Sequence, residues 1–195
     1  VRFNGLVTTS DTDNGLVTIT NDGQLTVTAT GDMDLQGAFL QDGDGVVSIA
    51  GNITTSDDDV TFESAVTLTD GIVISTGLGA GTVAFNDTLS SEASEDNTLE
   101  ITAGSGNIDF DAAVGSATDG ELGAITINSV DTLLADSTMD ARSFTQGAGS
   151  VLTQFDGAVT LSGLFDFTGT ALTFNAAGNT IGGTMDVSNA GVFTT

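Results

Sequence analysis

The chain has 195 residues, a hydrophobic fraction of 39% and a formal net charge of −25. Its only basic residues are Arg2 and Arg142, so it lacks the Lys and Arg clusters that neutralise nucleic-acid phosphates or anionic membrane surfaces. We therefore expect no nucleic-acid binding. No apolar run approaches the ~20 residues that span a bilayer, so we expect no membrane insertion. The absence of Cys rules out disulfides and fits an extracellular or cell-surface protein that relies on hydrogen bonds.

Short segments of alternating polar and apolar residues follow one another along the whole chain. This period of two places one side of each segment inward and the Thr, Asp and Ser side outward. Asp-Gly, Asn-Gly and Gly-rich turns separate the segments, and long runs of helix-forming residues are missing. The class is therefore all-β. The expected strands are residues 16–20, 25–30, 46–50, 60–62, 66–68, 72–74, 82–85, 99–101, 108–110, 124–127, 158–161 and 171–174.

A unit built on Phe recurs along the chain. Phe followed by an acidic residue, and then by Ala-Val, occurs at residues 62–66, 110–114 and 155–159, with looser copies at Phe85 and Phe174. Directly matched neighbours are 19 to 25 residues apart. A period of this length, made of short strands and tight turns, is typical of one coil of a parallel β-helix.

We predict a right-handed parallel β-helix of roughly eight or nine coils, about 40 Å long at about 4.8 Å per coil. Residues 1–195 should form a single solenoid segment, although the repeat is unclear between residues 130 and 150. The alternative is a pair of Ig-like β-sandwiches of about 95 residues each. Sandwich cores usually centre on Trp or Tyr and sandwich loops carry Pro, and the chain has none of these residues. The residues expected to stack in the solenoid core are Phe62, Phe85, Phe110, Phe155 and Phe174.

Both ends of the chain lie in strand-like sequence, at residues 1–3 and 192–195. There is no initiating Met and no signal peptide, so we interpret the chain as part of a longer repetitive polypeptide. Neither end resembles the polar or helical caps with which solenoids close. We therefore expect each end to continue into more of the same chain or into a neighbouring copy.

Residues 98–115, followed by residues 122–127, carry a resemblance to a known group. Their sequences, Thr-Leu-Glu-Ile-Thr-Ala-Gly-Ser-Gly-Asn-Ile-Asp-Phe-Asp-Ala-Ala-Val-Gly and Leu-Gly-Ala-Ile-Thr-Ile, resemble strand repeats of filamentous-haemagglutinin-like and autotransporter-like bacterial surface proteins. The resemblance covers about residues 60 to 175 and consists of repeat style. It implies a β-helical stalk on the cell surface or in a secreted fibre, with no catalytic motif to transfer. The lack of Lys departs from that group.

Catalytic residue combinations are scarce in this composition. Nucleophilic triads use a His base, and the chain has no His. A glycoside hydrolase requires only two carboxylates, which are plentiful. Carbohydrate sites, however, also use Trp, Tyr, Lys or Arg, and only the two Arg are present. We predict that the protein is not an enzyme, with an acidic-site glycoside hydrolase as the least favoured alternative.

Asp residues beside Gly indicate candidate calcium corners. Residues 11–15, Asp-Thr-Asp-Asn-Gly, have the spacing that opens a calcium loop but lack the closing Glu of an EF-hand. Asp beside Gly is also ordinary tight-turn chemistry, so both interpretations stay open. Apart from possible Ca²⁺, we expect no cofactor. The candidate Ca²⁺ ligands are Asp11, Asp13, Asp42, Asp44, Asp57, Asp58 and Asp59.

Thr-x-Thr pairs at residues 18–20, 26–28 and 67–69 resemble the arrays of ice-binding solenoids. Such an array needs Thr at the same position of every coil. The pairs do not recur in register in the sequence, so we interpret them as ordinary outward strand positions.

These patterns together predict a structural segment of an extracellular or cell-surface fibre or stalk, which works through rigidity and self-association. The expected partner is a second copy or a continuation of the same chain. The alternative is an adhesin module that recognises a glycan or a surface. An exposed patch of aromatic and polar residues would favour adhesion, whereas a uniformly acidic surface with apolar open ends would favour assembly.

Overall fold

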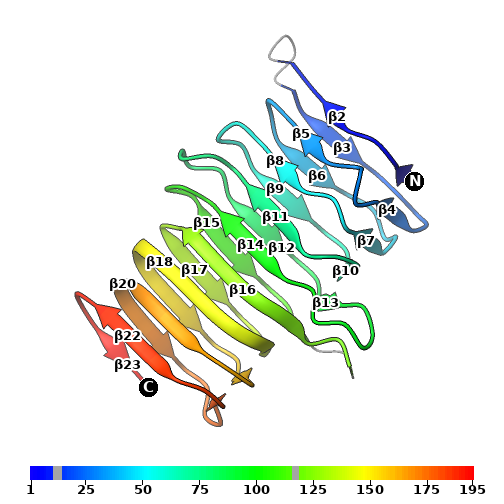
Figure 1. Cartoon of the computed structure of the whole chain (residues 1–195). Helices are drawn as coiled ribbons and strands as arrows, with labels where there is room; N and C mark the ends of the chain where they lie inside the picture. The colour runs from blue at the N-terminus through cyan, green and yellow to red at the C-terminus, as the bar shows by residue number, and fades with distance from the viewer. Residues whose placement is uncertain (11–14, 116–118) are drawn as a thin grey trace.

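The computed structural model describes residues 1–10, 15–115 and 119–195. Every regular element within these ranges is a β-strand, and the strands pair in parallel. The strands stack as a β-solenoid of about nine coils (Figure 1). The predicted solenoid is confirmed. The alternative of two Ig-like sandwiches is wrong, because such sandwiches are built from antiparallel sheets.

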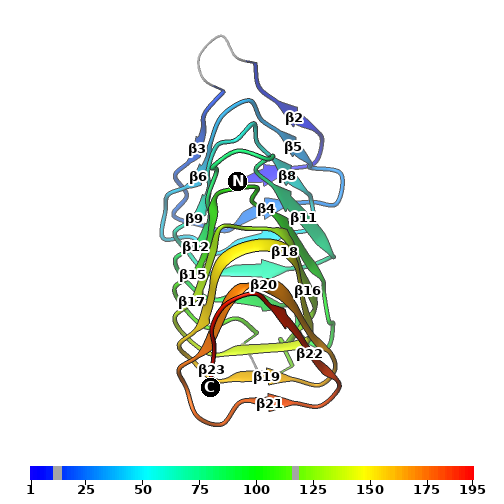
Figure 2. The ribbon, with the colours of Figure 1, turned by 90° about the vertical axis from the view of Figure 1, so that its left-hand side faces the viewer.

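Most coils contribute one strand to each of three faces, which Figure 2 shows obliquely from the C-terminal end. The first face contains β1 (Arg2–Phe3), β4 (Leu25–Val27), β7 (Val47–Ile49), β10 (Val66–Leu68), β13 (Leu89–Ser91), a bridge at Val114, the start of β18 (Met139–Phe155), β19 (Val159–Leu161) and β21 (Thr180–Ile181). The second face contains β2 (Val7–Thr8), β5 (Met33–Asp34), β8 (Ile53–Thr54), β11 (Ile72–Ser75), β14 (Leu99–Thr102), β16 (Leu122–Ser129), the middle of β18, the start of β20 (Phe165–Phe174) and β22 (Met185–Asn189). The third face contains β3 (Val17–Ile19), β6 (Phe39–Gln41), β9 (Val60–Phe62), β12 (Val83–Phe85), β15 (Asn107–Phe110), β17 (Thr132–Ala135), the ends of β18 and β20, and β23 (Phe193–Thr194).

We number the coils in chain order. Coils 1 to 5 hold three strands each, from β1–β3 to β13–β15, and coil 6 holds Val114, β16 and β17. Coil 7 is β18, coil 8 is β19 and β20, and coil 9 is β21 to β23. All the expected strands are present. The strands that sequence analysis missed are mostly two or three residues long, too short to show alternation.

The winding is right-handed. Figure 2 views the solenoid from its C-terminal end, where the last coil runs from β21 below, through β22 on the right, to β23 on the left. The chain thus turns anticlockwise as it advances toward the viewer. This is the hand that parallel strands joined by crossovers almost always adopt.

Coil length varies without disturbing the alignment of the strands. Paired residues of adjacent coils are 19 positions apart at Ser48 and Thr67, and 27 apart at Ile72 and Leu99. The range of 19 to 25 read from the Phe repeat is slightly narrower. The extra residues lie at the corners between faces, for example between β13 and β14, so the strands remain in register. Nine coils at about 4.8 Å each give a rod roughly 40 Å long.

The five phenylalanines expected in the core lie in one inward row of the third face: Phe62, Phe85, Phe110, Phe155 and Phe174. The ring centroids of Phe62 and Phe85 are 5.2 Å apart, and those of Phe85 and Phe110 are 5.6 Å apart. Phe155 and Phe174 stack at 5.2 Å. Ala135 occupies the row in the coil between Phe110 and Phe155, so the row consists of two stacks.

Three further buried phenylalanines, Phe144, Phe165 and Phe167, come from the second face. The ring of Phe144 lies 5.3 Å from Phe165, stacked, and 5.5 Å from Phe155, edge to face. These contacts join the second and third faces across the core. Sequence analysis missed these residues because they lie outside the repeated unit.

A buried polar cluster replaces Phe in coil 2. Gln41 occupies the row of Phe62 and is fully buried. Its Nε2 donates to Asn21 Oδ1 and to the Gly43 carbonyl, both at 2.9 Å, and its Oε1 accepts the Ser64 backbone N–H at 3.1 Å. In the described part of the chain, no buried side-chain nitrogen or oxygen lacks a partner. The core therefore tolerates an amide because every polar atom is hydrogen-bonded.

Residues 130–150, where the repeat is unclear in sequence, continue the solenoid without interruption. They form β17 and most of β18, which at 17 residues is the longest strand. β18 pairs with β19 near its start, and with β20 through its middle and end. Because β18 passes from face to face as one strand, its sequence lacks the strand–turn–strand spacing by which the other coils were recognised.

Glycine is required where the corners of adjacent coils touch. Gly115 has a φ of +71°, and a Cβ there would collide with the carbonyl oxygen of Asp140 in the next coil. A Cβ at Gly45 would likewise collide with the carbonyl oxygen of Gly23. At these corners glycine allows both the turn and the spacing between coils.

The Phe stack gives a testable prediction. Phe85→Ala should lower the free energy of unfolding by about 3–5 kcal/mol, because it empties a fully buried site between two stacked rings. Chemical denaturation followed by circular dichroism measures the change. Phe193→Ala is the matched control, since that ring is 44% exposed and its removal should cost much less. Equal losses at the two positions would contradict the stacked core.

Candidate functional site

Two of the candidate calcium ligands, Asp42 and Asp44, lie at the corner between β6 and β7. Both are exposed. Gly43, between them, turns its carbonyl inward to accept a hydrogen bond from buried Gln41 at 2.9 Å. The backbone of this corner therefore accepts a hydrogen bond from a side chain of the core. Asp11 and Asp13 lie outside the described residues.

Asp57, Asp58 and Asp59 lie at a different corner, between β8 and β9. The Asp57 carboxylate accepts the Gly79 backbone N–H at 2.6 Å, and that of Asp59 accepts the Thr82 N–H at 2.7 Å. Both bonds reach the next coil. Asp57 has a φ of +63°, a conformation that Asp tolerates in turns. Two of the three carboxylates therefore tie coil 3 to coil 4.

The structure does not bring these two groups of Asp together. One group lies where the third face meets the first, and the other where the second face meets the third. Among the described residues, no group of three or more His, Cys, Asp and Glu side chains is arranged to hold a metal ion. Calcium binding therefore stays a prediction without a defined site.

A row of carboxylates and amides follows the Phe row along one corner, one position after each core residue: Asp42, Glu63, Asn86, Asp111, Asp136, Asp156 and Asn175. Asn86 Nδ2 donates to Glu63 Oε2 at 2.9 Å, and Asn175 Nδ2 donates to Asp156 Oδ1 at 2.6 Å. Asn86 therefore separates the carboxylates of Glu63 and Asp111. Carboxylates occupy consecutive coils of this row with no amide between them at Asp42 and Glu63, and at Asp111, Asp136 and Asp156.

Asp109 completes an acidic cluster with Asp111 and Asp136. Partial burial is the largest cause that raises the pKa of Asp109, and the negative charges of Asp111 and Asp136 add to it. Burial also raises the pKa of Asp140, and burial followed by Glu95 raises that of Glu92. Carboxyl groups with raised pKa values can act as general acids. Here they lie on the outer surface of strands and corners, where partial burial raises the pKa, and neighbouring carboxylates add to it at Asp109 and Glu92.

The first face carries an uncharged strip over coils 2 to 5. Strands β4, β7, β10 and β13 contain no charged residue. Their outward row consists of hydroxyl side chains in register: Thr26, Ser48, Thr67 and Ser90. The expectation that the Thr pairs are out of register is therefore wrong for the pairs at 26–28 and 67–69, which share a row two coils apart. The pair at 18–20 begins on the third face.

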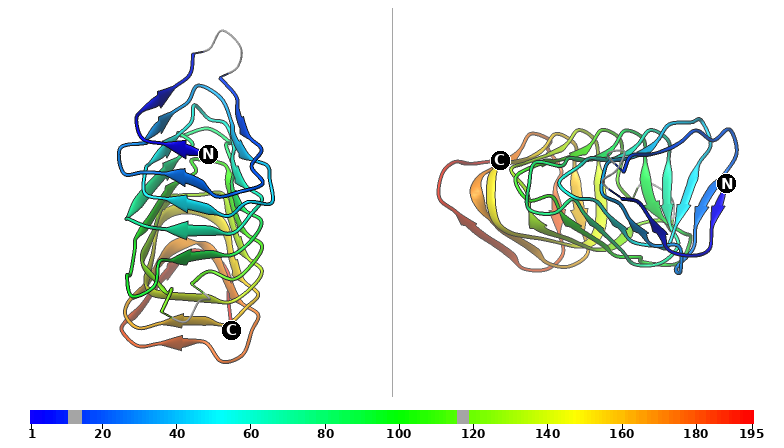
Figure 3. Two further views of the ribbon diagram at one scale, coloured as in Figure 1. Left: turned by 90° about the vertical axis from the view of Figure 1, so that its right-hand side faces the viewer. Right: turned by 90° about the horizontal axis from the view of Figure 1, so that it is seen from above.

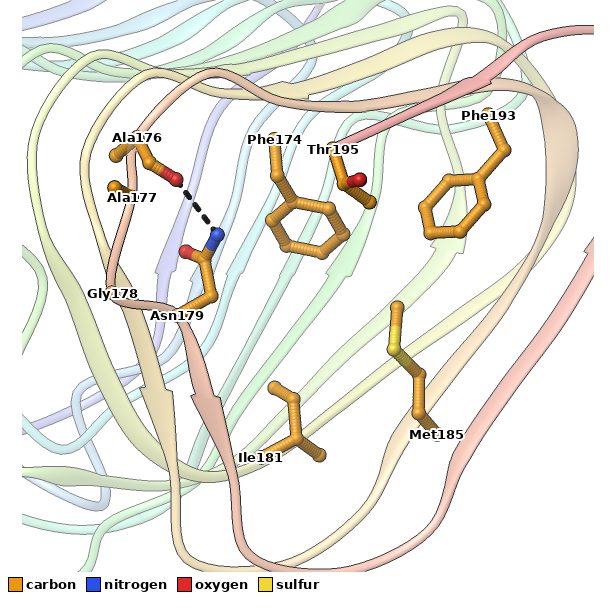
Figure 4. Close-up of a pocket in the computed structure, with 9 residues that line it drawn as sticks. All are labelled: Phe174, Ala176, Ala177, Gly178, Asn179, Ile181, Met185, Phe193 and Thr195. Carbon is orange, nitrogen blue, oxygen red and sulfur yellow. Dashed lines mark hydrogen bonds between the residues drawn. The ribbon is translucent and has the colours of Figure 1, made fainter.

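The C-terminal end of the solenoid is hollow. Figure 4 shows Phe174, Ile181, Met185 and Phe193 around a cavity of about 540 Å³. None of the described residues that line this cavity is Asp or Glu. Phe193 is 44% exposed and Met185 is 41% exposed, whereas the equivalent residues of inner coils are buried. The cavity is thus the uncovered end of the hydrophobic core.

The sequence led us to expect that each end continues into more of the same chain or into a neighbouring copy, but it did not identify the residues of the last described coil that face outward along the axis. Met185 and Phe193 occupy the same inward rows as Phe165 and Leu172, and differ from them in having no further described coil beside them. No local pattern distinguishes such residues from core residues. Their exposure depends only on their place in the stack.

Comparison with protein-family models, with curated proteins and with solved structures returned no match. The resemblance to haemagglutinin-like and autotransporter-like proteins therefore stays a prediction. Among the described residues, no helix is long and apolar enough to cross a membrane.

The crowded carboxylates predict a pH effect. The raised pKa of Asp109 means that the folded state holds this proton more tightly than the unfolded state does. The stability from this group is complete below its ordinary pKa and is lost as pH rises through the raised folded pKa. Asp109→Asn should prevent that loss and stabilise the protein at neutral pH by about 0.2–1 kcal/mol, as expected for relief of a like-charge contact between strands.

Urea unfolding between about pH 3 and pH 8, across the usual range of carboxyl titration, measures this effect. Asp34→Asn is the control, because the row neighbours of Asp34 are Thr8 and Thr54 rather than carboxylates. As the pH rises, the unmodified protein should lose the stability contributed by Asp109, and Asp109→Asn should not. Asp34→Asn should follow the pH profile of the unmodified protein much more closely. Identical pH profiles for all three proteins would contradict charge crowding at Asp109.

Proposed function

We propose that this chain is a rigid structural segment of an extracellular or cell-surface fibre or stalk. The observation that carries the proposal is the single core that runs through every coil. The inward row of the second face passes from Val7 to Val187 with one residue from each coil. Bending the rod would open this row on one side and compress it on the other.

Two kinds of contact resist bending. Backbone hydrogen bonds connect each coil to the next on all three faces, as at Met33 with Asn52 and Val60 with Thr82, both at 2.8 Å. Packed side chains, including the Phe stacks, fill the space between the faces. Protein interiors are packed as densely as organic crystals, so they have low compressibility. A spacer made in this way holds whatever it connects at a fixed distance.

The acidic surface supports the same role. With 27 Asp and Glu residues against two Arg, the sides of two rods repel one another. This repulsion keeps a rod separate from its lateral neighbours and soluble outside the cell. The low number of basic residues also leaves only two cleavage sites for trypsin-like proteases.

Adhesion to a glycan or a surface is the alternative function. Sugar-binding sites normally stack sugar rings on exposed aromatic side chains, and all aromatic residues of this chain are Phe. Of the eleven, nine are buried and Phe3 is partly buried, while Phe193 is exposed at the open end. The sides of the rod therefore lack the aromatic patch that would favour adhesion. A structural role therefore accounts better than adhesion for sides of the rod that carry many carboxylates and no aromatic patch.

Rigidity can be measured by pulsed electron–electron double resonance between two spin labels. The labels can be attached to engineered Cys pairs without interference, because the chain has no Cys of its own. Ser48 and Thr160 lie in one outward row of the first face, five coils apart. The pair should give a narrow distance distribution near 24 Å, with a label-dependent offset of about the size of the side chains. Moving the second spin label from Thr160 to Thr180, one coil further along the same row, should lengthen the distance by about 5 Å.

Broad distributions, or equal distances for the two pairs, would contradict a rigid rod. The same labelled proteins in urea provide the control for a flexible chain, in which the distributions should broaden. Specific retention of the unlabelled protein on immobilised neutral glycans would instead favour the adhesin.

A further inference from the structure

Asp-Gly pairs occur at several corners of the solenoid. The chain has six, all within the described residues, and their aspartates are Asp22, Asp42, Asp44, Asp70, Asp119 and Asp156. In such a pair the glycine nitrogen can attack the side-chain carboxyl group of the aspartate, because glycine has no side chain that blocks the approach. The product is a five-membered succinimide ring. In a folded protein, a pair reacts readily only when the nitrogen already lies close to the carboxyl carbon.

The corner at Asp70 and Gly71 joins β10 to β11 in coil 4, and both residues are exposed. Figures 1 and 3 place this coil inside the rod, with further coils on both sides. The Gly71 N–H donates a hydrogen bond to Asp70 Oδ1 at 2.8 Å. Since the carbon–oxygen bond is about 1.2 Å long, the Gly71 nitrogen lies at most about 4 Å from the carboxyl carbon. This separation is close to the ~3–3.5 Å between atoms that are about to react.

None of the other five described pairs has a hydrogen bond from the glycine N–H to its own aspartate. The Asp156 carboxylate instead accepts hydrogen bonds from Gln154 at 2.9 Å and from Asn175 at 2.6 Å. The Gly45 N–H donates to the Asn21 carbonyl of the preceding coil at 2.8 Å. At these two corners the carboxylate or the nitrogen is held by another partner, so the folded structure opposes ring closure.

We propose that Asp70 is a site of spontaneous isoaspartate formation in the folded protein. The Gly71 nitrogen forms a bond to Cγ of the protonated Asp70 carboxyl group. The Gly71 amide proton and the carboxyl hydroxyl leave together as water, and the succinimide remains. Water then adds to one of the two ring carbonyls. Cleavage of the bond between nitrogen and Cγ restores aspartate, whereas cleavage at the main-chain carbonyl gives isoaspartate, whose backbone passes through Cγ. One water is released and one is consumed, so composition is unchanged.

The corner has room for the ring and for the longer backbone of the product. The nearest atoms to a Cβ built on Gly71 belong to Thr98, and the closest is its rotatable hydroxyl oxygen at 2.5 Å. On either side, Thr69 N–H donates to the Ile49 carbonyl in coil 3 at 2.9 Å, and Ile72 N–H donates to the Thr98 carbonyl in coil 5 at 3.0 Å. The extra backbone atom should therefore bulge outward at the corner while the flanking strands keep their register.

The modification is a chemical record of age at one corner of the rod. The fraction of isoaspartate at residue 70 should rise with time, and the reaction needs no other molecule than water. It is separate from the structural role proposed above and would proceed whether or not the chain forms a fibre.

Peptide mapping by mass spectrometry, with electron-transfer fragmentation to distinguish isoaspartate from aspartate, tests the site. The protein is incubated for weeks at about pH 5, where more carboxyl groups are protonated than at neutral pH. In the folded protein, isoaspartate should form at residue 70 at least about tenfold faster than at residues 44 and 156, because geometry limits the reaction. In urea, where every corner is open, the three pairs should react at similar rates.

Two substitutions test the mechanism. Gly71→Ala places a methyl group beside the attacking nitrogen, and should lower isoaspartate at residue 70 about tenfold or more. Its coil should still fold, because Gly71 has no positive φ and the Thr98 hydroxyl can rotate away. Asp70→Asn changes the leaving group, so ring closure should release ammonia instead of water and yield aspartate and isoaspartate at that position. Asp156→Asn is the matched control and should release ammonia much more slowly.

Equal isoaspartate at residues 70, 44 and 156 of the folded protein would overturn the proposal, because the corner geometry would then give no preference. The same excess at residue 70 in urea would overturn it too, since the sequence alone would then determine the rate. An unchanged circular dichroism spectrum of Gly71→Ala shows that a lower yield reports the blocked nitrogen and not a lost fold. An unchanged yield in that folded variant would exclude attack by the Gly71 nitrogen.

Discussion

In-register parallel pairing between successive coils is the constraint on which the rest of the structure depends. It keeps each inward position directly above the equivalent position of the preceding coil, although coil length varies from 19 residues at Ser48–Thr67 to 27 at Ile72–Leu99. A shift of one residue would turn the apolar side of a strand outward. Length differences are therefore absorbed at the corners, where side chains such as Asp57 and Asp59 bond the backbone of the next coil.

The same register that stacks apolar residues also stacks charges. Identical positions recur at about 4.8 Å, so a carboxylate in one coil faces whatever occupies that row in the next. Amide side chains relieve the repulsion between stacked carboxylates, because Asn86 donates a hydrogen bond to Glu63 and Asn175 donates one to Asp156. Where they are missing, next to Asp109, partial burial raises the pKa of that carboxyl and the charges of Asp111 and Asp136 raise it further. The net charge of −25 is thus compatible with the solenoid because the rows combine carboxylates with neutral donors.

The repeat of Phe with an acidic residue was enough to predict the solenoid and its coil length, because each copy marks the same row of the third face. The sequence could not show that Gln41 and Ala135 occupy that row, since neither resembles Phe. The burial of Gln41 in this row depends on hydrogen bonds to residues about 20 positions away in the sequence, such as Asn21. The acidic corners were recognisable as turns. Their hydrogen bonds to the next coil depend on the winding, which no local pattern contains.

Rigidity follows from one property of such a stack. Each inner coil has two neighbours, and its stability is largely the sum of two interfaces. Coil 9 has one described neighbour, so Met185 and Phe193 are exposed although they occupy the rows of buried Phe165 and Leu172. Burial in the solenoid is therefore determined by the neighbouring coils and not by the local sequence.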